Sequence, residues 1–215
     1  DTKRDLSVEV VLNLLENDRI LSIMKERILV TGGTGYIGSH TVVELQNSGY
    51  DVVIVDNLSN SSADVVDNIE KVSGIRPAFE KLDCLDLEGM DKLFTKYPGI
   101  KGIIHFAASK AVGESVQKPL LYYRNNLVSL INLLELMPKH GVEGIIFSSS
   151  CTVYGQPDVL PVTEEAPIKK AESPYGNTKQ INEEIIRDTV ASGSPINAIM
   201  LRYFNPIGAH PTALI

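Results

Sequence analysis

The clearest indication of the fold is residues 27–40, Arg27-Ile-Leu-Val-Thr-Gly-Gly-Thr-Gly-Tyr-Ile-Gly-Ser-His40. Residues 28–30 predict a short buried strand and Ile37–Asn47 predict a helix, and the turn between them holds Gly32, Gly33, Gly35 and Gly38. A strand that turns sharply into a helix directs free backbone N–H groups and the positive end of the helix dipole at one point. Glycine also lets a phosphate approach the backbone without meeting a Cβ. The spacing fits the dinucleotide fingerprint Gly-x-Gly-x-x-Gly from residue 33, and Gly-x-x-Gly-x-x-Gly from residue 32.

Asp56 supplies the context that a glycine turn by itself lacks. It ends a second predicted buried strand, Val52–Val55, about 20 residues after the glycines, where a carboxylate can accept both ribose hydroxyls of an adenosine. No Arg stands among Asn57–Ala63 to pair with a 2′-phosphate, which favours NAD over NADP. An ordinary turn residue is the alternative interpretation of Asp56. Together the two features predict an NAD site.

Composition limits the remaining possibilities. A chain of 215 residues with 43% hydrophobic residues suits one α/β domain, with the start of a second. The formal net charge of −7 and the lack of a basic run argue against nucleic acid and membrane as partners. Cys84 and Cys151 have no metal-ligand spacing, and no apolar run approaches a transmembrane length. We therefore expect a soluble cytoplasmic protein without a metal.

From Lys25 onward, strand and helix patterns alternate. Strands are predicted at Arg27–Thr31, Val52–Val55, Ala78–Leu82, Gly102–Phe106, Gly144–Ser148 and Ala198–Leu201, and helices at Ile37–Asn47, Ala63–Ser73, Glu88–Lys96, Pro119–Met137 and Tyr175–Ala191. Gly49, Gly74, Gly99 and Gly141 fall where helices should end. Several strands are continuously apolar, which is typical of a parallel sheet covered on both faces. The predicted fold class is α/β, a Rossmann-type doubly wound parallel sheet, with ligands at the carboxyl ends of the strands.

Polar or small residues follow several of these strands. Asp83, after the third strand, can hydrogen-bond an adenine amino group or be a plain turn residue. Ala107 and Ala108 follow the fourth strand and leave room for a cofactor along the backbone. Lys110 can reach a phosphate or the nicotinamide ribose, or be a solvated lysine. Asn125 in the long helix is either a satisfied buried amide or a residue that supports the site.

Ser150, Tyr175 and Lys179 form a candidate catalytic group. Tyr175 and Lys179 are four residues apart, so they share one face of a helix that begins near Pro174. A free phenol has a pKa of about 10, and a nearby ammonium, together with an oxidised nicotinamide, favours the phenolate and lowers that pKa. Ser150 ends a neighbouring strand and can share the hydrogen bond to the reacting hydroxyl. An exposed Tyr–Lys helix pair is the alternative interpretation.

Other reactive side chains suggest no further chemistry. Cys151 has no local histidine that could activate it, and we interpret it as a small buried filler. His40, His105 and His140 are scattered and are expected to be structural, while nothing decides the role of His210.

Six stretches make the chain resemble the extended short-chain dehydrogenase/reductase family, most closely its branch of nucleotide-sugar 4-epimerases. They are Val30–His40, Val55–Leu58, His105–Ser115, Ser148–Gly155, Tyr175–Lys179 and Leu201–Pro206. They span residues 25 to about 211. The Lys-Ala-Val-Gly-Glu-Ser segment at 110–115 is the most specific to the epimerases, whereas the glycine turn is shared more widely.

The resemblance implies an activity and a set of site residues. Members of this branch interconvert UDP-glucose and UDP-galactose by moving a hydride from the sugar C4 to NAD and back to the opposite face. Tyr175 would be the base, Lys179 would hold the nicotinamide ribose, and Ser150 would bridge tyrosine and substrate. Cofactor-binding positions would be Gly32, Gly35, Tyr36, Ile37, Gly38, Asp56, Asn57, Asp83, Phe106, Ala107, Ala108, Lys110, Asn125, Tyr175 and Lys179. Lys110, Ser150, Tyr175 and Asn205 would bind the UDP-sugar.

Two departures from the family pattern stand out. Cys151 replaces an alanine that is more usual after the serines. Family members also continue beyond the position of Ile215 into a smaller domain that holds the uracil. We therefore expect residues 24–202 to be the NAD-binding domain and residues 203–215 the start of a truncated substrate-binding region. On this view the chain binds NAD but turns over UDP-galactose poorly or not at all.

Competing functions come from three classes. A nucleotide-sugar 4,6-dehydratase needs an extra acid and base, and Cys151-Thr152-Val153 has no carboxylate at the equivalent stretch. An epimerase of another UDP-sugar, such as an N-acetylated one, stays open. The third alternative is a non-catalytic NAD-binding module. The intact Ser150, Tyr175 and Lys179 argue against that role for the parent protein, whereas the expected truncation argues for it in this chain.

The first 23 residues and the oligomeric state are the least readable features. Val10, Val11, Leu14 and Leu15 recur at helical spacing, so residues 1–23 are expected to be an appendage that can form a helix. A signal peptide is unexpected because there is no basic start, continuous apolar core or cleavage site. Dimers in the family pack helices that correspond to Pro119–Met137 and Tyr175–Ala191, which allows a homodimer here.

Overall fold

Six parallel strands form the centre of the computed structural model, which describes residues 25–215. The strands are β1 (Arg27–Thr31), β2 (Asp51–Asp56), β3 (Ala78–Lys81), β4 (Ile100–His105), β5 (Gly144–Ser150) and β6 (Asn197–Tyr203). Their order in the sheet is β3-β2-β1-β4-β5-β6, with every neighbouring pair parallel. Strands β2 and β3 lie on one side of β1, and β4, β5 and β6 lie on its other side. The strand order therefore changes direction between β1 and β4, and ligands bind at this switch point in doubly wound sheets. The predicted fold class is confirmed.

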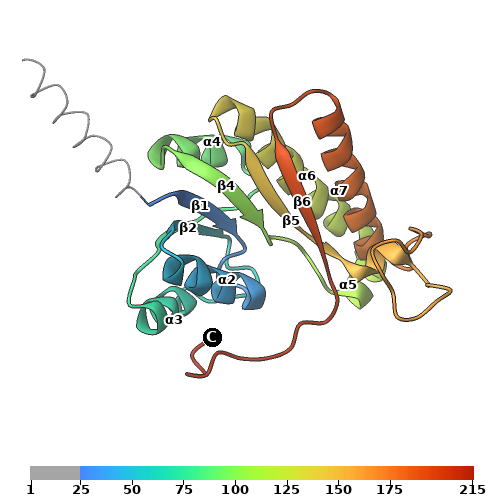
Figure 1. Ribbon diagram of the computed structural model, residues 1–215, viewed down its shortest axis with the longest axis horizontal. Coiled ribbons are helices and arrows are strands. Elements are labelled where there is room, and N and C mark those ends of the chain that lie inside the picture. The colour runs from blue at the N-terminus through green and yellow to red at the C-terminus, as the bar shows by residue number, and fades with distance from the viewer. Residues whose placement is uncertain (1–24) are drawn as a thin grey trace, which may run out of the picture.

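Helices cover the sheet from both faces (Figure 1). They are α2 (Tyr36–Asn47), α3 (Asp64–Ser73), α4 (Leu87–Lys96), α5 (Val112–Gln117), α6 (Pro119–Lys139), η1, a 3₁₀ helix (Cys151–Tyr154), and α7 (Pro174–Ala191). In the view of Figure 1, α2 and α3 lie in front of β1 and β2, while α6 and α7 lie behind the sheet.

Two apolar layers result from this arrangement. Alternate residues of the strands point to opposite faces, so Leu29 and Ile103 pack against α4, α6 and α7, whereas Val30 and Ile54 pack against α2 and α3. Leu29, Val30 and Ile54 are fully buried. Residues on both faces of the central strands are therefore withdrawn from water, which explains the continuous apolar runs in the sequence.

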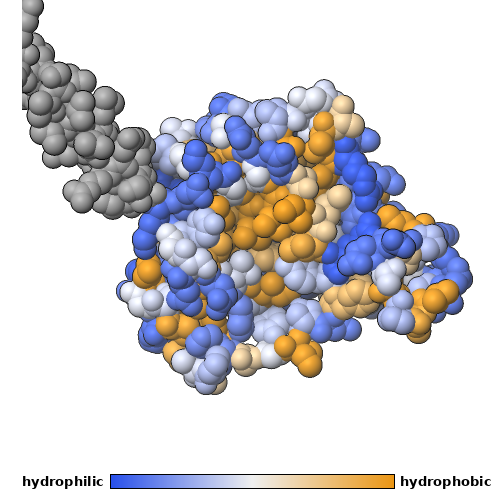
Figure 2. Space-filling model, viewed as in Figure 1, coloured by the Kyte–Doolittle hydropathy of each residue, from blue (hydrophilic) through white to orange (hydrophobic). Residues whose placement is uncertain are grey.

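One part of the sheet is left open. Ile199 and Leu201 on β6 are 57% and 39% exposed. They contribute to an apolar area on the same face of the sheet as α2 and α3, but these helices pack over β1 and β2 and leave β6 uncovered. Figure 2 shows this area as a hydrophobic patch in the middle of the front face. The open area lies away from the layer that α6 and α7 bury.

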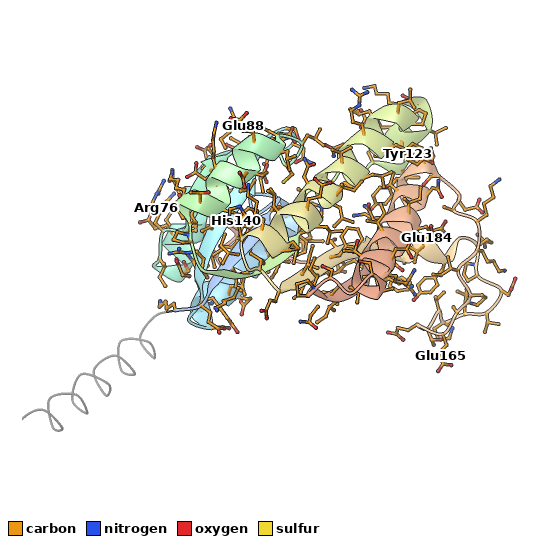
Figure 3. All side chains as sticks on the ribbon, turned by 90° about the horizontal axis from the view of Figure 1, so that it is seen from above. Arg76, Glu88, Tyr123, His140, Glu165 and Glu184 are labelled. Carbon is orange, nitrogen blue, oxygen red and sulfur yellow. The ribbon has the colours of Figure 1, made fainter. Side chains whose placement is uncertain are left out.

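Charged side chains lie on the outer surfaces of the helices. Figure 3 shows Glu88 on α4 and Glu184 on α7 directed away from the sheet. Arg76, also labelled there, forms exposed ion pairs with Asp67 and Glu70 of α3. Among residues 25–215, no helix combines the length and hydrophobicity that a membrane crossing requires.

The predicted elements differ from the observed ones mainly in the short helices. Neither α5 nor η1 is predicted, because six and four residues are too few to display a helical period. Most element ends differ from the predicted bounds by one or two residues; α3 begins at Asp64, not Ala63, and β4 begins at Ile100, not Gly102. The four glycines expected to end helices all have positive φ. The helix predicted within residues 1–23 lies outside the described residues.

Candidate functional site

A pocket of about 930 Å³ runs along the carboxyl ends of the strands. It brings together every residue that the sequence singles out for cofactor, substrate or catalysis. These are Gly32, Gly35, Tyr36, Ile37, Gly38, Asp56, Asn57, Asp83, Phe106, Ala107, Ala108, Lys110, Asn125, Ser150, Tyr175, Lys179 and Asn205. They come from positions throughout the chain, and they meet because parallel strands all end at the same edge of the sheet.

The glycine turn between β1 and α2 forms one wall and leaves no room for side chains. Gly32 has φ +70°, its N–H donates to the Val55 carbonyl at 2.8 Å, and a Cβ there would lie 2.7 Å from the Ala107 nitrogen. A Cβ on Gly38 would lie only 2.2 Å from the Gly32 oxygen. Gly35 caps α2 without a side-chain hydrogen bond, so the first amides of the helix are left for a ligand.

Two carboxylates stand beside this wall. Asp56, which ends β2 and is 7% exposed, accepts hydrogen bonds from the Thr34 N–H at 3.2 Å and the Leu58 N–H at 2.9 Å. Asp83 follows β3 and accepts from the side-chain amide of Asn57 at 2.9 Å. The backbone donors hold Asp56 at the rim of the glycine turn, so this end of the pocket is acidic and rich in acceptors for hydroxyl and amino groups.

Ser150, Tyr175 and Lys179 meet at the other end of the pocket. Ser150 ends β5, and its hydroxyl oxygen accepts a hydrogen bond from the Thr152 N–H at 3.2 Å. Ser173 caps α7 by accepting from the Gly176 N–H at 3.1 Å, which places Tyr175 in the first turn. The Lys179 ammonium lies 5.8 Å from the centre of the Tyr175 ring. The predicted common face of α7 is present.

Burial sets the electrostatics of this pair. Lys179 is 3% exposed, its Nζ donates to the Ser148 carbonyl at 2.7 Å and lies 4.8 Å over the Phe147 ring, and desolvation lowers its pKa to about 8. Burial also raises the pKa of Tyr175, against an opposing hydrogen bond from Ser150. In the protein alone, removing the phenol from water thus sets the direction of the shift. The lowering expected from Lys179 together with an oxidised nicotinamide stays a prediction.

The loop after β4 is held by amide side chains of α6. Asn125 donates to the Ser109 hydroxyl at 3.1 Å, which supports a loop-fixing role. Asn126 is 1% exposed, accepts from the Ser109 N–H at 2.8 Å and donates to the Thr178 hydroxyl on α7 at 3.1 Å. Lys110 itself is exposed and lines the pocket. Sequence reasoning missed Asn126 because one buried asparagine beside another carries no periodic signal.

Further pocket residues went unrecognised in the sequence. They include Cys84, Leu85, Glu114, Tyr122, Arg124, Ser129, Cys151 and Thr152. The epimerase-like segment at 110–115 was the available signal for Glu114, whose carboxylate accepts from the Tyr122 hydroxyl at 2.9 Å. Cys151 is a correction: it is partly exposed at the pocket wall, not a buried filler, because η1 begins at that residue and turns it toward the pocket.

Asn205 lies in the segment that follows β6. It is exposed at the mouth of the pocket, and the preceding Tyr203 ring lies 6.4 Å from the Phe106 ring of the β4 loop. Beyond it, the Gly208 carbonyl accepts a hydrogen bond from the Tyr36 hydroxyl at 2.7 Å. The segment therefore crosses from the catalytic end of the pocket to the glycine turn.

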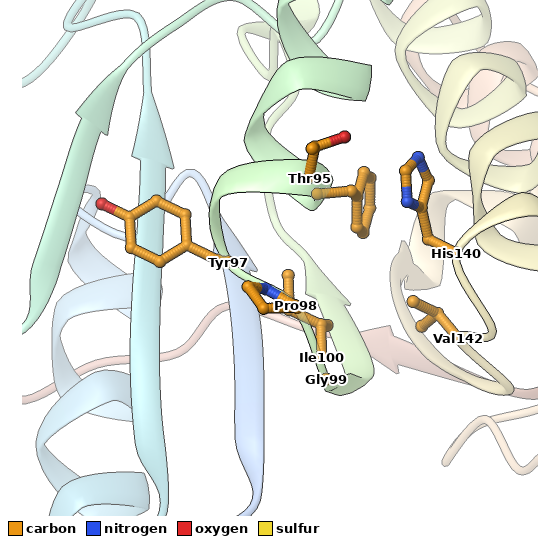
Figure 4. A pocket seen from close by; sticks show the side chains of 8 residues that line it. Thr95, Tyr97, Pro98, Gly99, Ile100, His140 and Val142 are labelled. Atoms are coloured by element: carbon orange, nitrogen blue, oxygen red, sulfur yellow. The ribbon is translucent and has the colours of Figure 1, made fainter.

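The histidines and a second, smaller pocket lie apart from this site. His105 is buried against Thr31, and His210 bonds to Thr212. The second pocket, of about 290 Å³, lies at the amino ends of β4 and β5 and is lined by Phe94, Tyr97, Pro98, Ile100, His140 and Val142 among others (Figure 4). It contains none of the residues predicted for cofactor, substrate or catalysis. Within residues 25–215, no group of His, Cys, Asp and Glu could hold a metal ion.

Comparison with known proteins relates this geometry to a family. Residues 28–215 match the model of the NAD dependent epimerase/dehydratase family. The chain is 51% identical over 190 residues to a UDP-glucose 4-epimerase of Dictyostelium discoideum, covering 88% of this chain and 55% of the relative. It is 52% identical over 188 residues to the Bacillus subtilis UDP-glucose 4-epimerase, covering 87% and 55%. The chain spans about half the length of the curated relatives it matches.

Solved structures agree with the sequence relatives. The UDP-glucose 4-epimerase from Bifidobacterium longum in complex with NAD+ and UDP superposes with a TM-score of 0.86 at 47% identity, covering 88% of this chain and 56% of that one. An epimerase from Thermotoga maritima with UDP-glucose gives a TM-score of 0.74 at 34% identity, covering 82% and 55%.

Proposed function

The chain belongs to the NAD dependent epimerase/dehydratase family, and from this premise we propose that it is the NAD-binding part of an enzyme that interconverts UDP-glucose and UDP-galactose. The observation that carries the proposal is the single pocket that joins the glycine turn and Asp56 to Ser150, Tyr175 and Lys179. Residues 24–202 would be the cofactor domain. Residues 203–215 would begin the part that meets the sugar.

The residues at the acidic end fit NAD. The free amides at the start of α2, in a turn that has no room for a Cβ at Gly32 or Gly38, suit a diphosphate. Asp56 keeps acceptor capacity toward the pocket for two ribose hydroxyls, and Asp83 lies beside it for the adenine. Lys110, Asn125 and Lys179 would line the nicotinamide half. When bound, NAD would supply a hydride acceptor at C4 of the sugar and return the hydride to it.

The side chains at the other end would move the proton. Tyr175 would take the proton of the sugar 4-hydroxyl as the hydride leaves, and would give it back after the sugar has turned over. Ser150 would bridge the tyrosine and the sugar oxygen, donating its O–H to one of them and accepting from the other, since the Thr152 N–H takes only one of its two lone pairs. Lys179 would hold the nicotinamide ribose.

Charge explains when the phenol becomes a base. Burial keeps the pKa of Tyr175 high in the protein alone. An opposite charge within about 4–6 Å favours the ionised form. The positive charges of the nicotinamide and of the Lys179 ammonium would therefore together lower the pKa of Tyr175, so that the phenolate could form. The base would therefore be generated only when the oxidised cofactor is in place.

We also propose a cytoplasmic homodimer that pairs through α6 and α7. Leu121, Val128 and Ile131 on α6 and Val190 on α7 are exposed apolar side chains, which supports pairing of these helices. Two free thiols, Cys84 and Cys151, suit a reducing compartment.

Calorimetric titration with NAD tests the cofactor half of the proposal. We expect one NAD per chain. Asp56→Asn should weaken binding by about tenfold or more, since hydrogen bonds to a charged group contribute about 1.5–3 kcal/mol. Asp51→Asn, at the opposite end of the same strand in an exposed pair with Arg27, should leave the affinity unchanged. Absence of NAD binding, or equal losses in both variants, would contradict the assignment.

Conversion of UDP-galactose to UDP-glucose in the presence of NAD tests the catalytic half. In a full-length version that also carries the sugar-binding part, Tyr175→Phe should cut the rate by about 10²-fold or more if the phenol is the general base, with NAD affinity within about threefold. A near-normal rate would remove Tyr175 from the mechanism. The 215-residue chain alone should bind NAD with little or no turnover, and robust epimerisation by it would contradict that expectation.

A further inference from the structure

A buried carboxylate lies directly behind the candidate catalytic group. Glu183 on α7 has no exposed surface, and it accepts a hydrogen bond from the Ser149 hydroxyl at 2.6 Å. Arg202 of β6 clamps both of its oxygens, with Nε at 2.9 Å and Nη2 at 2.8 Å. Arg187, exposed one turn farther along α7, adds a contact at 2.6 Å. One carboxylate thus joins α7, β5 and β6.

Two routes lead from Glu183 to Ser150. The first is short, because Ser149 precedes Ser150 in β5 and is paired with Arg202 across the β5–β6 ladder. The second passes through Arg202, whose Nη1 donates to the Tyr154 hydroxyl at 2.9 Å and whose guanidinium lies 4.8 Å over the Tyr154 ring. Tyr154 ends η1, and Ser150 caps η1 by accepting from the Thr152 N–H. Both routes restrain the serine.

Glu183 also lies on α7, the helix that carries Tyr175 and Lys179. It follows Lys179 by four residues and Tyr175 by eight, so all three lie along one side of α7. Figure 1 shows α7 beside β6, and the carboxylate ties the helix to this strand and to β5. The segment after β6 carries Asn205. The elements that present Ser150, Tyr175, Lys179 and Asn205 therefore meet at Glu183, whereas Lys110 lies in the loop after β4.

We propose that Glu183 is the positioning residue that holds the Ser150 hydroxyl against the Tyr175 phenol. The inference rests on the proposed function for its catalytic meaning, and on the contacts above for its geometry. Withdrawing a carboxylate and an arginine from water is costly, so a buried pair is weak evidence for stability as such. Catalytic groups must keep their mutual geometry, since a displacement of about 1 Å can cost about 10²-fold in rate.

The ionisation of Tyr175 provides a test that needs neither cofactor nor turnover. Ser150, Cys151, Lys179 and, from α6, Tyr122 face or influence this phenol. Losing the hydrogen bond from Ser150 raises the pKa of Tyr175, whereas removing the negative charge of Glu183 lowers it by electrostatics alone. The direction of the change in Glu183→Gln therefore separates positioning from a simple charge effect.

The experiment is a spectroscopic titration of the tyrosines in the full chain, with Tyr175→Phe identifying the signal. We expect Glu183→Gln to raise the pKa of Tyr175 and to leave NAD affinity within about threefold. In a full-length version that also carries the sugar-binding part, it should lower kcat by about tenfold or more with KM little changed. Arg187→Ala is the matched control, because Arg187 touches the same carboxylate but no other group of the cluster. It should match the unaltered chain in every measurement.

Ser149→Ala keeps the proposal testable if Glu183→Gln fails to fold. It removes only the hydroxyl bound to Glu183 and leaves the Arg202 pair in place, so the pKa of Tyr175 should move in the same upward direction. An unchanged or lowered pKa in the folded variants would overturn the positioning role. Failure of the proposed function would show differently, as absence of NAD binding by the unaltered chain, while the titration result stands independently.

Discussion

Lys179 shows at the scale of one residue how function conflicts with stability. Its ammonium is buried with a carbonyl and an aromatic face as neighbours, and no ion pair to it is found among residues 25–215. Its pKa falls from 10.5 to about 8, so the folded state releases the proton more readily than the unfolded state does. Between these values the unfolded chain binds more protons, and stability rises with pH. Below pH 8 the cost of burying the charge is fully present.

Lys179→Met should therefore stabilise the protein while removing function. The difference between 10.5 and about 8 corresponds to about 3 kcal/mol as an upper limit, and Met has a similar length without the charge. We expect a gain of about 1–3 kcal/mol in the free energy of unfolding at pH 7, measured in urea, together with weaker NAD binding. Lys110→Met, at an exposed position, should change stability by less than about 0.5 kcal/mol. A destabilised Lys179→Met would show that the ammonium is compensated in the fold.

At the scale of the element, the turn from β1 to α2 depends on backbone contact. Gly38 in α2 lies against the turn so closely that only a hydrogen fits between the helix and Gly32. This contact brings the start of α2 next to the loop after β4, where Ala107 limits the space on the other side of Gly32. The direction of the free amides at the start of α2 is set by this backbone packing. A Cβ added at Gly32 or Gly38 would therefore displace them.

Gly38→Ala should disrupt this element. The Cβ would meet the Gly32 oxygen at 2.2 Å, a backbone atom that cannot rotate away. We expect a loss of about 1–3 kcal/mol in the free energy of unfolding from overpacking, and at least about tenfold weaker NAD binding by calorimetry because the amides move.

Gly113→Ala in α5 is the matched control for this prediction. Nothing lies within 4 Å of a Cβ there, so the substitution should be neutral or slightly stabilising. Equal effects of the two substitutions would contradict the contact argument.

At the scale of the whole molecule, a histidine in the sheet makes stability depend on pH. His105 ends the central strand β4, is 2% exposed, and shares a 2.7 Å hydrogen bond with Thr31 of β1. Burial lowers its pKa from 6.5 to about 3, with a smaller contribution from the nearby Lys179. In that interval the unfolded chain takes up a proton that the folded chain does not, so stability falls as the pH is lowered.

Urea unfolding between pH 6.5 and pH 5 should reveal this effect before the carboxylates titrate. We expect the free energy of unfolding to fall by about 1.6 kcal/mol across the interval, with the slope approaching about 1.4 kcal/mol per pH unit at its lower end. His105→Asn keeps a donor and an acceptor for Thr31 but cannot titrate, so its stability should vary less with pH. The same slope in both proteins would assign the effect to other groups.

The sequence determined the alternation of strands and helices, the glycine turn and the acidic residue after β2. Each depends on local causes that a linear pattern displays: continuous apolar runs, glycine at sharp turns, and a carboxylate at the end of a strand. The common face of Tyr175 and Lys179 follows from helical spacing in the same way. The catalytic and binding roles of these residues remain predictions.

The meeting of the strand ends in one pocket, and the pKa shifts that burial causes there, could be seen only in the folded molecule. Strand order placed Asp56 and Asn205 on one pocket, and the fold of η1 turned Cys151 toward it. The pKa values of Tyr175 and Lys179 depend on neighbours distant in the chain, as does the cluster around Glu183. Desolvation and long-range contacts are properties of the packed molecule, so no local pattern could display them.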